Sequence, residues 1–242
     1  MILSNILLAA LVLLVPLNIN TSVKNFDSNH SLNNYLLDNN TSSFLVSEKG
    51  EIIIDEEFKI KSSFKPKSVA FTNLLQHGFV QNRSQEDVAS IQKSFVSVLI
   101  GIAQQKGLID INNPVSLYIG KWTQIEEKKE DLITVRNLLT MTSGLDASLN
   151  YLSDPGSEWF YNSRAYSYLI DVLEKSSGIQ VNDLSSEWLF RELEMQETFW
   201  KERRKGVMGF PKDSSKYGLV TTAKDLLKFG EFILNGGEVG TN

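Results

Sequence analysis

The pattern of apolar and polar positions predicts one β-hairpin and, beyond it, a mainly helical chain. Apolar residues fill positions 44–46 and 52–54, and a turn around Lys49 and Gly50 separates them, as in two short antiparallel strands. One hairpin followed by a helical block is the order of an α+β protein. A two-stranded hairpin is marginally stable in water by itself, so we expect its sheet to need strands from elsewhere.

The helical block carries recognisable start and stop signals. Thr134 can cap a helix, and Thr222 with Asp225 forms a capping-box pattern before the last apolar-periodic segment, which Gly236 ends. Residues 183–193 predict another short helix. There is no internal repeat.

The N-terminal part of the chain differs from the rest. Residues 6–17 are nearly all apolar and too short to span a bilayer comfortably. We therefore expect 1–20 to be a signal-like segment and the protein to be exported, either periplasmic or membrane-anchored facing the periplasm. No Lys or Arg precedes the apolar run and no A-x-A site follows it, so a cleaved leader and an uncleaved anchor are both open. Residues 21–42 are rich in Asn, Ser and Asp and indicate a polar linker, which leaves 43–242 as the folded domain.

Composition narrows the class of protein. With 242 residues, 42% of them apolar and 22% charged, the chain can bury the core of one domain or of two closely packed subdomains. A net charge of −5 without basic clusters argues against nucleic acid as a partner. The densest basic run, 201–205, is interpreted as a solvated loop. The absence of cysteine removes disulfides, thiol catalysis and a bacterial lipid anchor.

Ser90 and Lys93, in the run D-V-A-S-I-Q-K-S-F of residues 87–95, are the strongest candidates for chemistry. If a helix begins at Ser90, both side chains share one face and the lysine can take the proton of the serine. The following apolar residues recur at helical spacing and would bury this helix: Phe95, Val98, Leu99 and Ile102. The pattern also fits a serine that caps the helix beside a solvated lysine. A second pair, Ser62 and Lys65, lies in a polar stretch without apolar periodicity, and we discard it.

Tyr161 is the second candidate, in the segment P-G-S-E-W-F-Y-N-S-R-A-Y. It comes just before a stretch with a helical apolar face that Gly178 ends. A phenol on a loop entering a helix could share a proton with Ser90 and Lys93. The alternatives are a core aromatic for Tyr161 and a helix cap for Ser163. The aromatic residues 159–161 could likewise line a cleft or pack in a core.

Together these segments resemble the serine hydrolases related to class C β-lactamases, a family that includes penicillin-binding DD-peptidases, esterases and amide hydrolases. The resemblance rests on five segments in the family's order: Q-K-S-F-V-S-V-L-I-G-I-A, G-L-I-D-I-N-N-P-V, I-T-V-R-N-L-L-T-M-T-S-G-L, P-G-S-E-W-F-Y-N-S-R-A-Y and G-L-V-T-T-A-K-D-L-L-K-F-G. It implies a β-lactamase/transpeptidase-like fold, with Ser90 as the acylated nucleophile, Lys93 as its base and Tyr161 as the catalytic tyrosine. Where the family usually has Tyr-x-Asn this chain has Tyr-Asn-Ser, so Ser163 takes the expected substrate-binding position.

The resemblance also implies a third motif, K-T-G or an equivalent on a later strand, and the 242 residues contain none in that place. In the family, the backbone N–H of that strand completes an oxyanion hole with the amide of Ser90. We therefore expect the domain to be incomplete, with the C-terminal strands of its sheet missing. A non-catalytic remnant of the fold, binding a ligand or without function, is the alternative to an enzyme.

The expected function is acyl-enzyme formation on a small amide or ester, either a β-lactam, a D-Ala peptide or a simple ester. We expect a monomer with no partner but its substrate, and no membrane contact beyond an N-terminal anchor. His30 lies in the polar lead-in and His77 in an expected loop. There is no G-x-S-x-G, H-E-x-x-H or glycine-rich phosphate loop, so we expect no cofactor and no metal.

Overall fold

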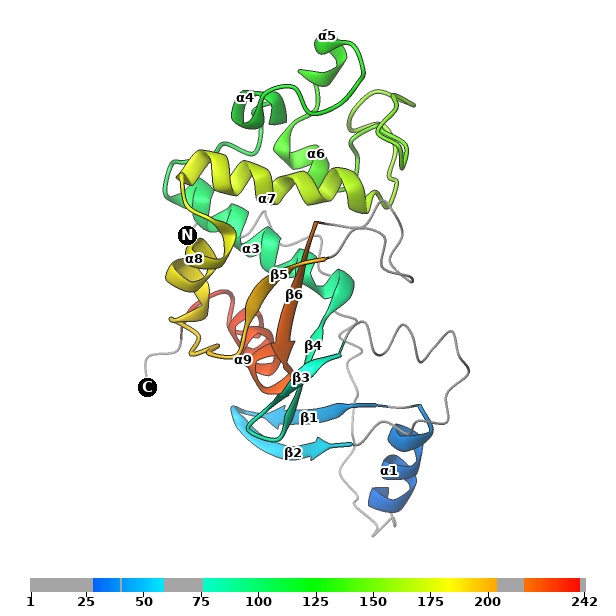
Figure 1. The fold of residues 1–242 in the computed structure, drawn as a ribbon, viewed down its shortest axis with the longest axis vertical. Coiled ribbons are helices and arrows are strands. Elements are labelled where there is room, and N and C mark those ends of the chain that lie inside the picture. Colours follow the sequence, from blue (N-terminus) through cyan, green and yellow to red (C-terminus); the bar gives the residue numbers. More distant parts are fainter. Residues whose placement is uncertain (1–27, 40, 59–75, 204–215, 240–242) are drawn as a thin grey trace.

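The computed structural model describes residues 28–39, 41–58, 76–203 and 216–239 (Figure 1). The signal-like segment 1–20 lies outside them. The strands are β1 (Ser43–Glu48), β2 (Glu51–Glu57), β3 (Gln76–Val80), β4 (Arg83–Asp87), β5 (Phe199–Glu202) and β6 (Tyr217–Thr222). The helices are α1 (Ser28–Asp38), α3 (Gln92–Gln105), α4 (Val115–Ile119), α5 (Glu127–Glu130), α6 (Val135–Leu139), α7 (Ser163–Ser177), α8 (Val181–Ser185) and α9 (Ala223–Leu234), with a 3₁₀ turn η2 (Ala89–Ile91) and a π-turn η3 (Ser186–Phe190).

The predicted hairpin is confirmed, and a second sheet lies beyond it. β1 and β2 pair antiparallel, and the turn between them places Lys49 and Gly50 at φ 53° and 83°. The other four strands form an antiparallel sheet in the order β3-β4-β6-β5. The α+β class is therefore confirmed, but the expectation of an almost purely helical chain after the first hairpin was wrong. Strands flank the helical block on both sides in the sequence.

The polar sequence of β4 explains why this second sheet was not predicted. Its residues R-S-Q-E-D show no apolar alternation, although Ser84 and Asp87 are buried. The amide of Ser84 donates a hydrogen bond to Glu57 Oε2 over 3.2 Å, and the carboxylate of Asp87 pairs with Arg203. Polar partners thus replace the apolar contacts that a strand pattern normally signals. His77, expected in a loop, lies in β3.

Part of the segment expected to be a polar linker is helical. α1 occupies half of residues 21–42, and Leu36 on this helix is buried. The abundance of Asn and Ser, which are weak helix formers, concealed this helix in the sequence.

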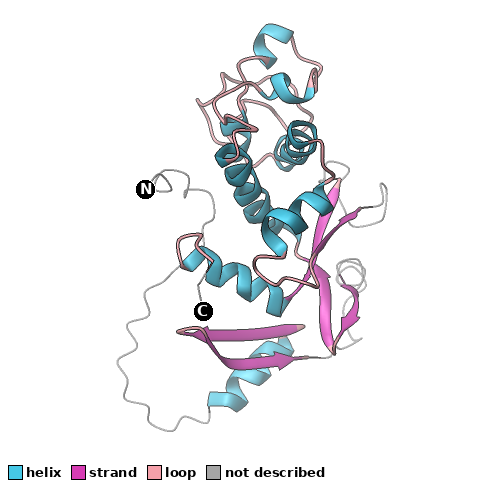
Figure 2. Cartoon of the chain, turned by 90° about the vertical axis from the view of Figure 1, so that its left-hand side faces the viewer, coloured by secondary structure: helices cyan, strands magenta, loops and turns pink. Residues whose placement is uncertain are grey.

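α3 and α7 pack against each other at the centre of the helical block (Figure 1). Phe95 of α3 is fully buried and stacks on Phe229 of α9, with ring centroids 3.7 Å apart. Figure 2 shows this block on one side of the four-stranded sheet. α9 contacts β4 and β6 and also β1, where Ser47 Oγ donates a hydrogen bond to Glu231 Oε1 over 2.5 Å. α9 therefore connects the two sheets.

The predicted helix signals are confirmed. Thr134 and Asn137 form a capping box at the start of α6. Thr222 accepts a hydrogen bond from the amide of Asp225 over 3.2 Å at the start of α9. Gly178 ends α7 in the left-handed conformation, with φ of 72°. These local signals need no tertiary information, so the sequence shows them directly.

The short helix expected over 183–193 is found as α8 followed by the π-turn η3. Among the described residues, none of the helices is long and apolar enough to cross a membrane.

Candidate active site

The turn between β4 and α3 carries Ser90 at the surface. Asp87 ends β4, the 3₁₀ turn η2 follows, and α3 begins at Gln92. Ser90 is exposed within this turn, so the predicted helix start is displaced by two residues. Ala89, just before it, has φ of 48°, a left-handed conformation that is unfavourable for a residue with a Cβ. The backbone is thus bent sharply where the candidate nucleophile sits.

The structure brings the three predicted catalytic residues together. Lys93 Nζ lies 3.3 Å from Ser90 Oγ, one helical turn away, and the two groups are hydrogen-bonded. The hydroxyl of Tyr161, 71 residues further along the chain, donates a hydrogen bond to Ser90 Oγ over 2.8 Å. Lys93 Nζ also lies 5.1 Å from the centre of the Tyr161 ring. Ser90 therefore has an amine and a phenol within proton-transfer distance, and Tyr161 is exposed rather than packed in the core.

The surroundings of Tyr161 favour its ionised form. Burial raises the pKa of the phenol, but its hydrogen bonds with Ser90 and Lys93, together with the charge of Lys93, outweigh burial and hold the pKa below its ordinary value. A lowered pKa makes a phenol a better proton carrier near neutral pH. At 46% exposure, Tyr161 is also accessible from solvent, which a residue of the core is not.

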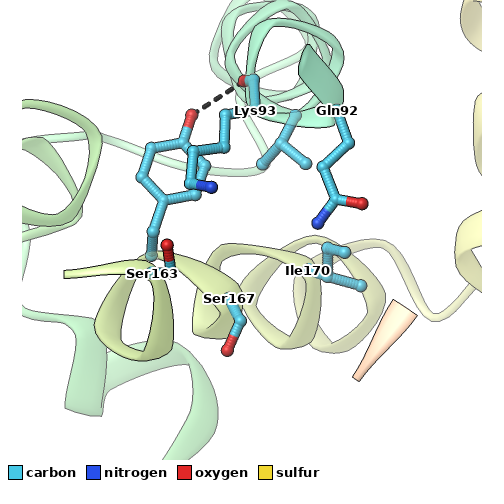
Figure 3. A pocket seen from close by; sticks show the side chains of 7 residues that line it. Gln92, Lys93, Ser163, Ser167 and Ile170 are labelled. Atoms are coloured by element: carbon cyan, nitrogen blue, oxygen red, sulfur yellow. Dashed lines mark hydrogen bonds between the residues drawn. The ribbon is translucent and has the colours of Figure 1, made fainter. Parts of the chain in front are cut away.

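Tyr166 connects α7, which follows Tyr161, to α3, which carries Lys93. Its hydroxyl donates a hydrogen bond to the carbonyl oxygen of Lys93 over 2.8 Å, which is the dashed line in Figure 3. Burial, with a smaller contribution from the charge of Tyr161, raises the pKa of Tyr166 well above its usual range. Tyr166 therefore stays protonated and acts as a structural donor beside the site.

Ser163, the predicted substrate-binding residue, lies beside Lys93 in a small hollow between α3 and α7 (Figure 3). The hollow has a volume of about 10 Å³, close to the space that one water molecule needs. The helix cap that we considered for Ser163 is provided by Asn162. Its Oδ1 accepts from the amide of Ala165 over 3.0 Å, and its Nδ2 donates to the carbonyl oxygen of Asp146 over 2.8 Å. Ser163 is thereby left without the capping role.

The aromatic residues before Tyr161 are on the surface rather than in the core. Trp159 is 67% exposed and Phe160 is 46% exposed. The rings of Trp159 and Tyr161 are 6.4 Å apart. We considered that residues 159–161 line a cleft or pack in a core. Their exposure favours the first interpretation, with the aromatic rings accessible to solvent near the candidate nucleophile.

Sequence reasoning missed an ionic contact beneath Ser90. Arg203 belongs to the basic run interpreted as a solvated loop, but it pairs with the buried carboxylate of Asp87. The expectation of a solvated run was therefore wrong at this position. The two residues are 116 positions apart, and no spacing rule connects them. Within the part of the chain that the structure describes, no cluster of His, Cys, Asp or Glu could hold a metal ion.

The comparison with known proteins identifies the family. A family model described as Beta-lactamase matches residues 43–242. The chain belongs to the Beta-lactamase family. Members of this family are generally serine hydrolases, and the β-lactamase/transpeptidase-like fold expected from the sequence is confirmed.

Individual members of the Beta-lactamase family are distant from this chain. An uncharacterized protein of Alkalihalophilus pseudofirmus is 27% identical over 175 residues, which cover 65% of this chain and 51% of that protein. The octameric penicillin-binding protein homologue from Pyrococcus abyssi has a TM-score of 0.64 at 15% identity, over 88% of this chain and 58% of that one. A class C β-lactamase has a TM-score of 0.61 at 20% identity, over 85% of this chain and 63% of that one. The structural matches show the shared fold, and the chain spans about half the length of the relative from Alkalihalophilus.

Proposed function

We propose that this protein is a serine hydrolase that forms an acyl-enzyme at Ser90 on small amide or ester substrates. One observation carries the proposal. Ser90 Oγ lies on an exposed turn within hydrogen-bonding distance of both Lys93 Nζ, at 3.3 Å, and the Tyr161 hydroxyl, at 2.8 Å. A serine becomes a useful nucleophile when a neighbouring base takes its proton, and here two proton carriers flank it.

The proposed reaction has two halves. In the first, Ser90 Oγ attacks the carbonyl carbon of the substrate while its proton passes to Lys93, which acts as the base. The bond to the leaving nitrogen or oxygen then breaks, and Tyr161 protonates that atom and regains a proton from Lys93. In the second, water attacks the ester formed at Ser90, the same groups move its proton, and the carboxylic acid leaves with Ser90 restored.

The site has a polar and an apolar side for a substrate. Ser163 offers a hydroxyl next to Lys93. This hydroxyl can accept a hydrogen bond from the N–H of a substrate amide or donate one to its carbonyl oxygen. Trp159 and Phe160 offer exposed rings next to Tyr161. We propose amides or esters that combine a hydrogen-bonding acyl group with an apolar substituent, a class that includes β-lactams, D-Ala peptides and simple esters.

Covalent labelling tests the proposal. The protein is incubated with a fluorophosphonate probe, and its intact mass is measured. Attack by Ser90 Oγ on phosphorus with loss of fluoride should add one probe per chain, and Ser90→Ala should abolish the adduct. Ser143→Ala, which removes a buried hydroxyl elsewhere in the fold, is the matched control and should label normally. No adduct on the unsubstituted protein, or an adduct that survives Ser90→Ala, would contradict the proposal and favour a binding role.

We also propose that the protein is exported and acts as a monomer. Export is supported by the apolar run at 6–17, and fractionation of producing cells tests it. The Pyrococcus abyssi homologue is octameric, so size-exclusion chromatography with light scattering is needed to determine the assembly state. A mass several times that of one chain would overturn the monomer.

A further inference from the structure

A buried ion pair lies directly beneath the turn that carries Ser90. The carboxylate of Asp87 is 4% exposed, and Arg203 contacts both of its oxygens. Arg203 Nε donates to Oδ2 over 2.8 Å, and Arg203 Nη2 donates to Oδ1 over 2.6 Å. This is the bidentate geometry that arginine makes with carboxylates, and it fixes the orientation of the Asp87 side chain.

The same carboxylate acts on the backbone next to Ser90. Asp87 Oδ1 accepts a hydrogen bond from the amide of Ala89 over 2.8 Å. Ala89 has the left-handed φ of 48°, which an alanine adopts only when its surroundings stabilise it. The carboxylate that Arg203 orients therefore holds the unfavourable bend from which the Ser90 side chain projects.

The other side of the turn is held by the same arginine through Gln92. Arg203 Nη2 donates to Gln92 Oε1 over 3.3 Å, and the amide of Leu219 in β6 donates to the same oxygen over 3.1 Å. Gln92 is buried and opens α3, between Ser90 and Lys93. Arg203 thus contacts the residues on both sides of the nucleophile and joins them to the sheet.

The space around the ion pair is fully occupied. A Cβ on Gly218 would lie 2.0 Å from Asp87 Oδ2 and 2.7 Å from Arg203 Nε. Glycine at this position of β6 is what allows the carboxylate and the guanidinium to reach each other. The pairing is therefore built into the strand, and it is not an incidental contact between surface side chains.

We propose that Arg203 is a positioning residue for the nucleophile: through Asp87 and Gln92 it holds the Ala89 bend and so keeps Ser90 Oγ within reach of Lys93 and Tyr161. The proposal rests on the proposed function of Ser90. Stability alone is a poor explanation for this contact, because a buried ion pair is often no better for stability than apolar side chains of the same size. The ion pair also makes one hydrogen bond with the amide of Ala89 and one with Gln92, and both residues flank Ser90.

The test is single-turnover acylation by a p-nitrophenyl ester, which separates the acylation rate at saturation from the ester concentration that gives half of it. Arg203→Met should lower the saturating rate about 10-fold to 100-fold, as expected for a misplaced nucleophile, and leave the half-saturating concentration within about twofold. Arg203→Lys keeps the charge but loses the bidentate geometry. Its saturating acylation rate should lie between those of Arg203→Met and the unsubstituted protein. Lys201→Met is the matched control, two residues earlier in β5. Lys201 contacts His77, and this variant should acylate at the normal rate.

Thermal melting of each variant gives its folded fraction, and rates are compared per folded molecule. If Arg203→Met does not fold, Arg203→Lys decides the question. An Arg203→Lys rate equal to that of the unsubstituted protein, a loss confined to the half-saturating concentration, or a loss that vanishes after correction for the folded fraction would overturn the positioning role. Failure of the proposed function looks different, because then the unsubstituted protein itself gives no Ser90 adduct, and both proposals fall.

Discussion

Tyr161→Phe removes one oxygen atom from the candidate site and leaves the ring in place. In the structure that oxygen donates a hydrogen bond to Ser90 Oγ over 2.8 Å. One hydrogen bond contributes about 0.5–1.5 kcal/mol to stability, and less at a side chain that is 46% exposed. We therefore expect the free energy of unfolding to fall by about 1 kcal/mol or less. A proton carrier in the transition state is worth about 10²-fold to 10⁴-fold in rate, or about 3–5 kcal/mol in the barrier.

The expected loss in the free energy of unfolding is much smaller than the expected increase in the reaction barrier, so the two effects can be distinguished. Hydrolysis of a p-nitrophenyl ester is measured beside a urea unfolding curve, with Tyr118→Phe as the control. The Tyr118 hydroxyl also makes a short hydrogen bond, accepting from the amide of Asp110 over 2.8 Å, but it lies on α4. Tyr161→Phe should be folded and nearly inactive, while Tyr118→Phe should be folded and active. Because the pKa of Tyr161 is lowered, its titration should also disappear from the pH dependence of acylation. Unchanged turnover in Tyr161→Phe would refute the proton-carrier role.

Three further predictions concern other parts of the structure. Lys93→Arg should lose about 10²-fold or more in ester hydrolysis, since arginine cannot act as a base; retained turnover would point to another base. Gly218→Ala should cost roughly 1–3 kcal/mol in urea unfolding through overpacking against Asp87; an unchanged midpoint would contradict the close packing. The hydrogen bond and charge of Arg83 lower the pKa of Asp55 against an opposing effect of burial. This pair should therefore add up to about 1 kcal/mol to the free energy of unfolding. That contribution is present at pH values above the ordinary pKa of Asp and is lost as the pH falls below it. Arg83→Gln should flatten that acid limb in melts from pH 6 to 2, and an unaltered limb would count against the pair.

Local signals account for the helix boundaries that the sequence predicted correctly. Helical spacing and a following amphipathic helix made Ser90, Lys93 and Tyr161 candidates, the family resemblance suggested their roles, and the structure places the three side chains in contact. The caps at Thr134 and Thr222 are equally local. Each of these inferences depends on residues within a few positions of one another, where backbone geometry decides the outcome.

Long-range polar contacts account for what the sequence did not predict. β4 is a strand whose buried positions are polar, so neither its periodicity nor its composition suggests a sheet. Arg203 was assigned to solvent because a run of basic residues usually lies there. Its burial depends on Asp87, 116 residues earlier, and on a glycine in a strand that was not predicted. Such an ion pair can be recognised only after the sheet has brought its strands together.

The position of α9 affects when the first hairpin can become fully ordered. The first hairpin is made early in synthesis, yet its β1 strand packs against the last described helix, with Ser47 bonded to Glu231 across 184 residues. Contacts of such long sequence separation are slow to form because the intervening chain must first be ordered. The hairpin should therefore remain open to hydrogen exchange until α9 has docked, and its amides should be protected in the same kinetic phase as those of α9.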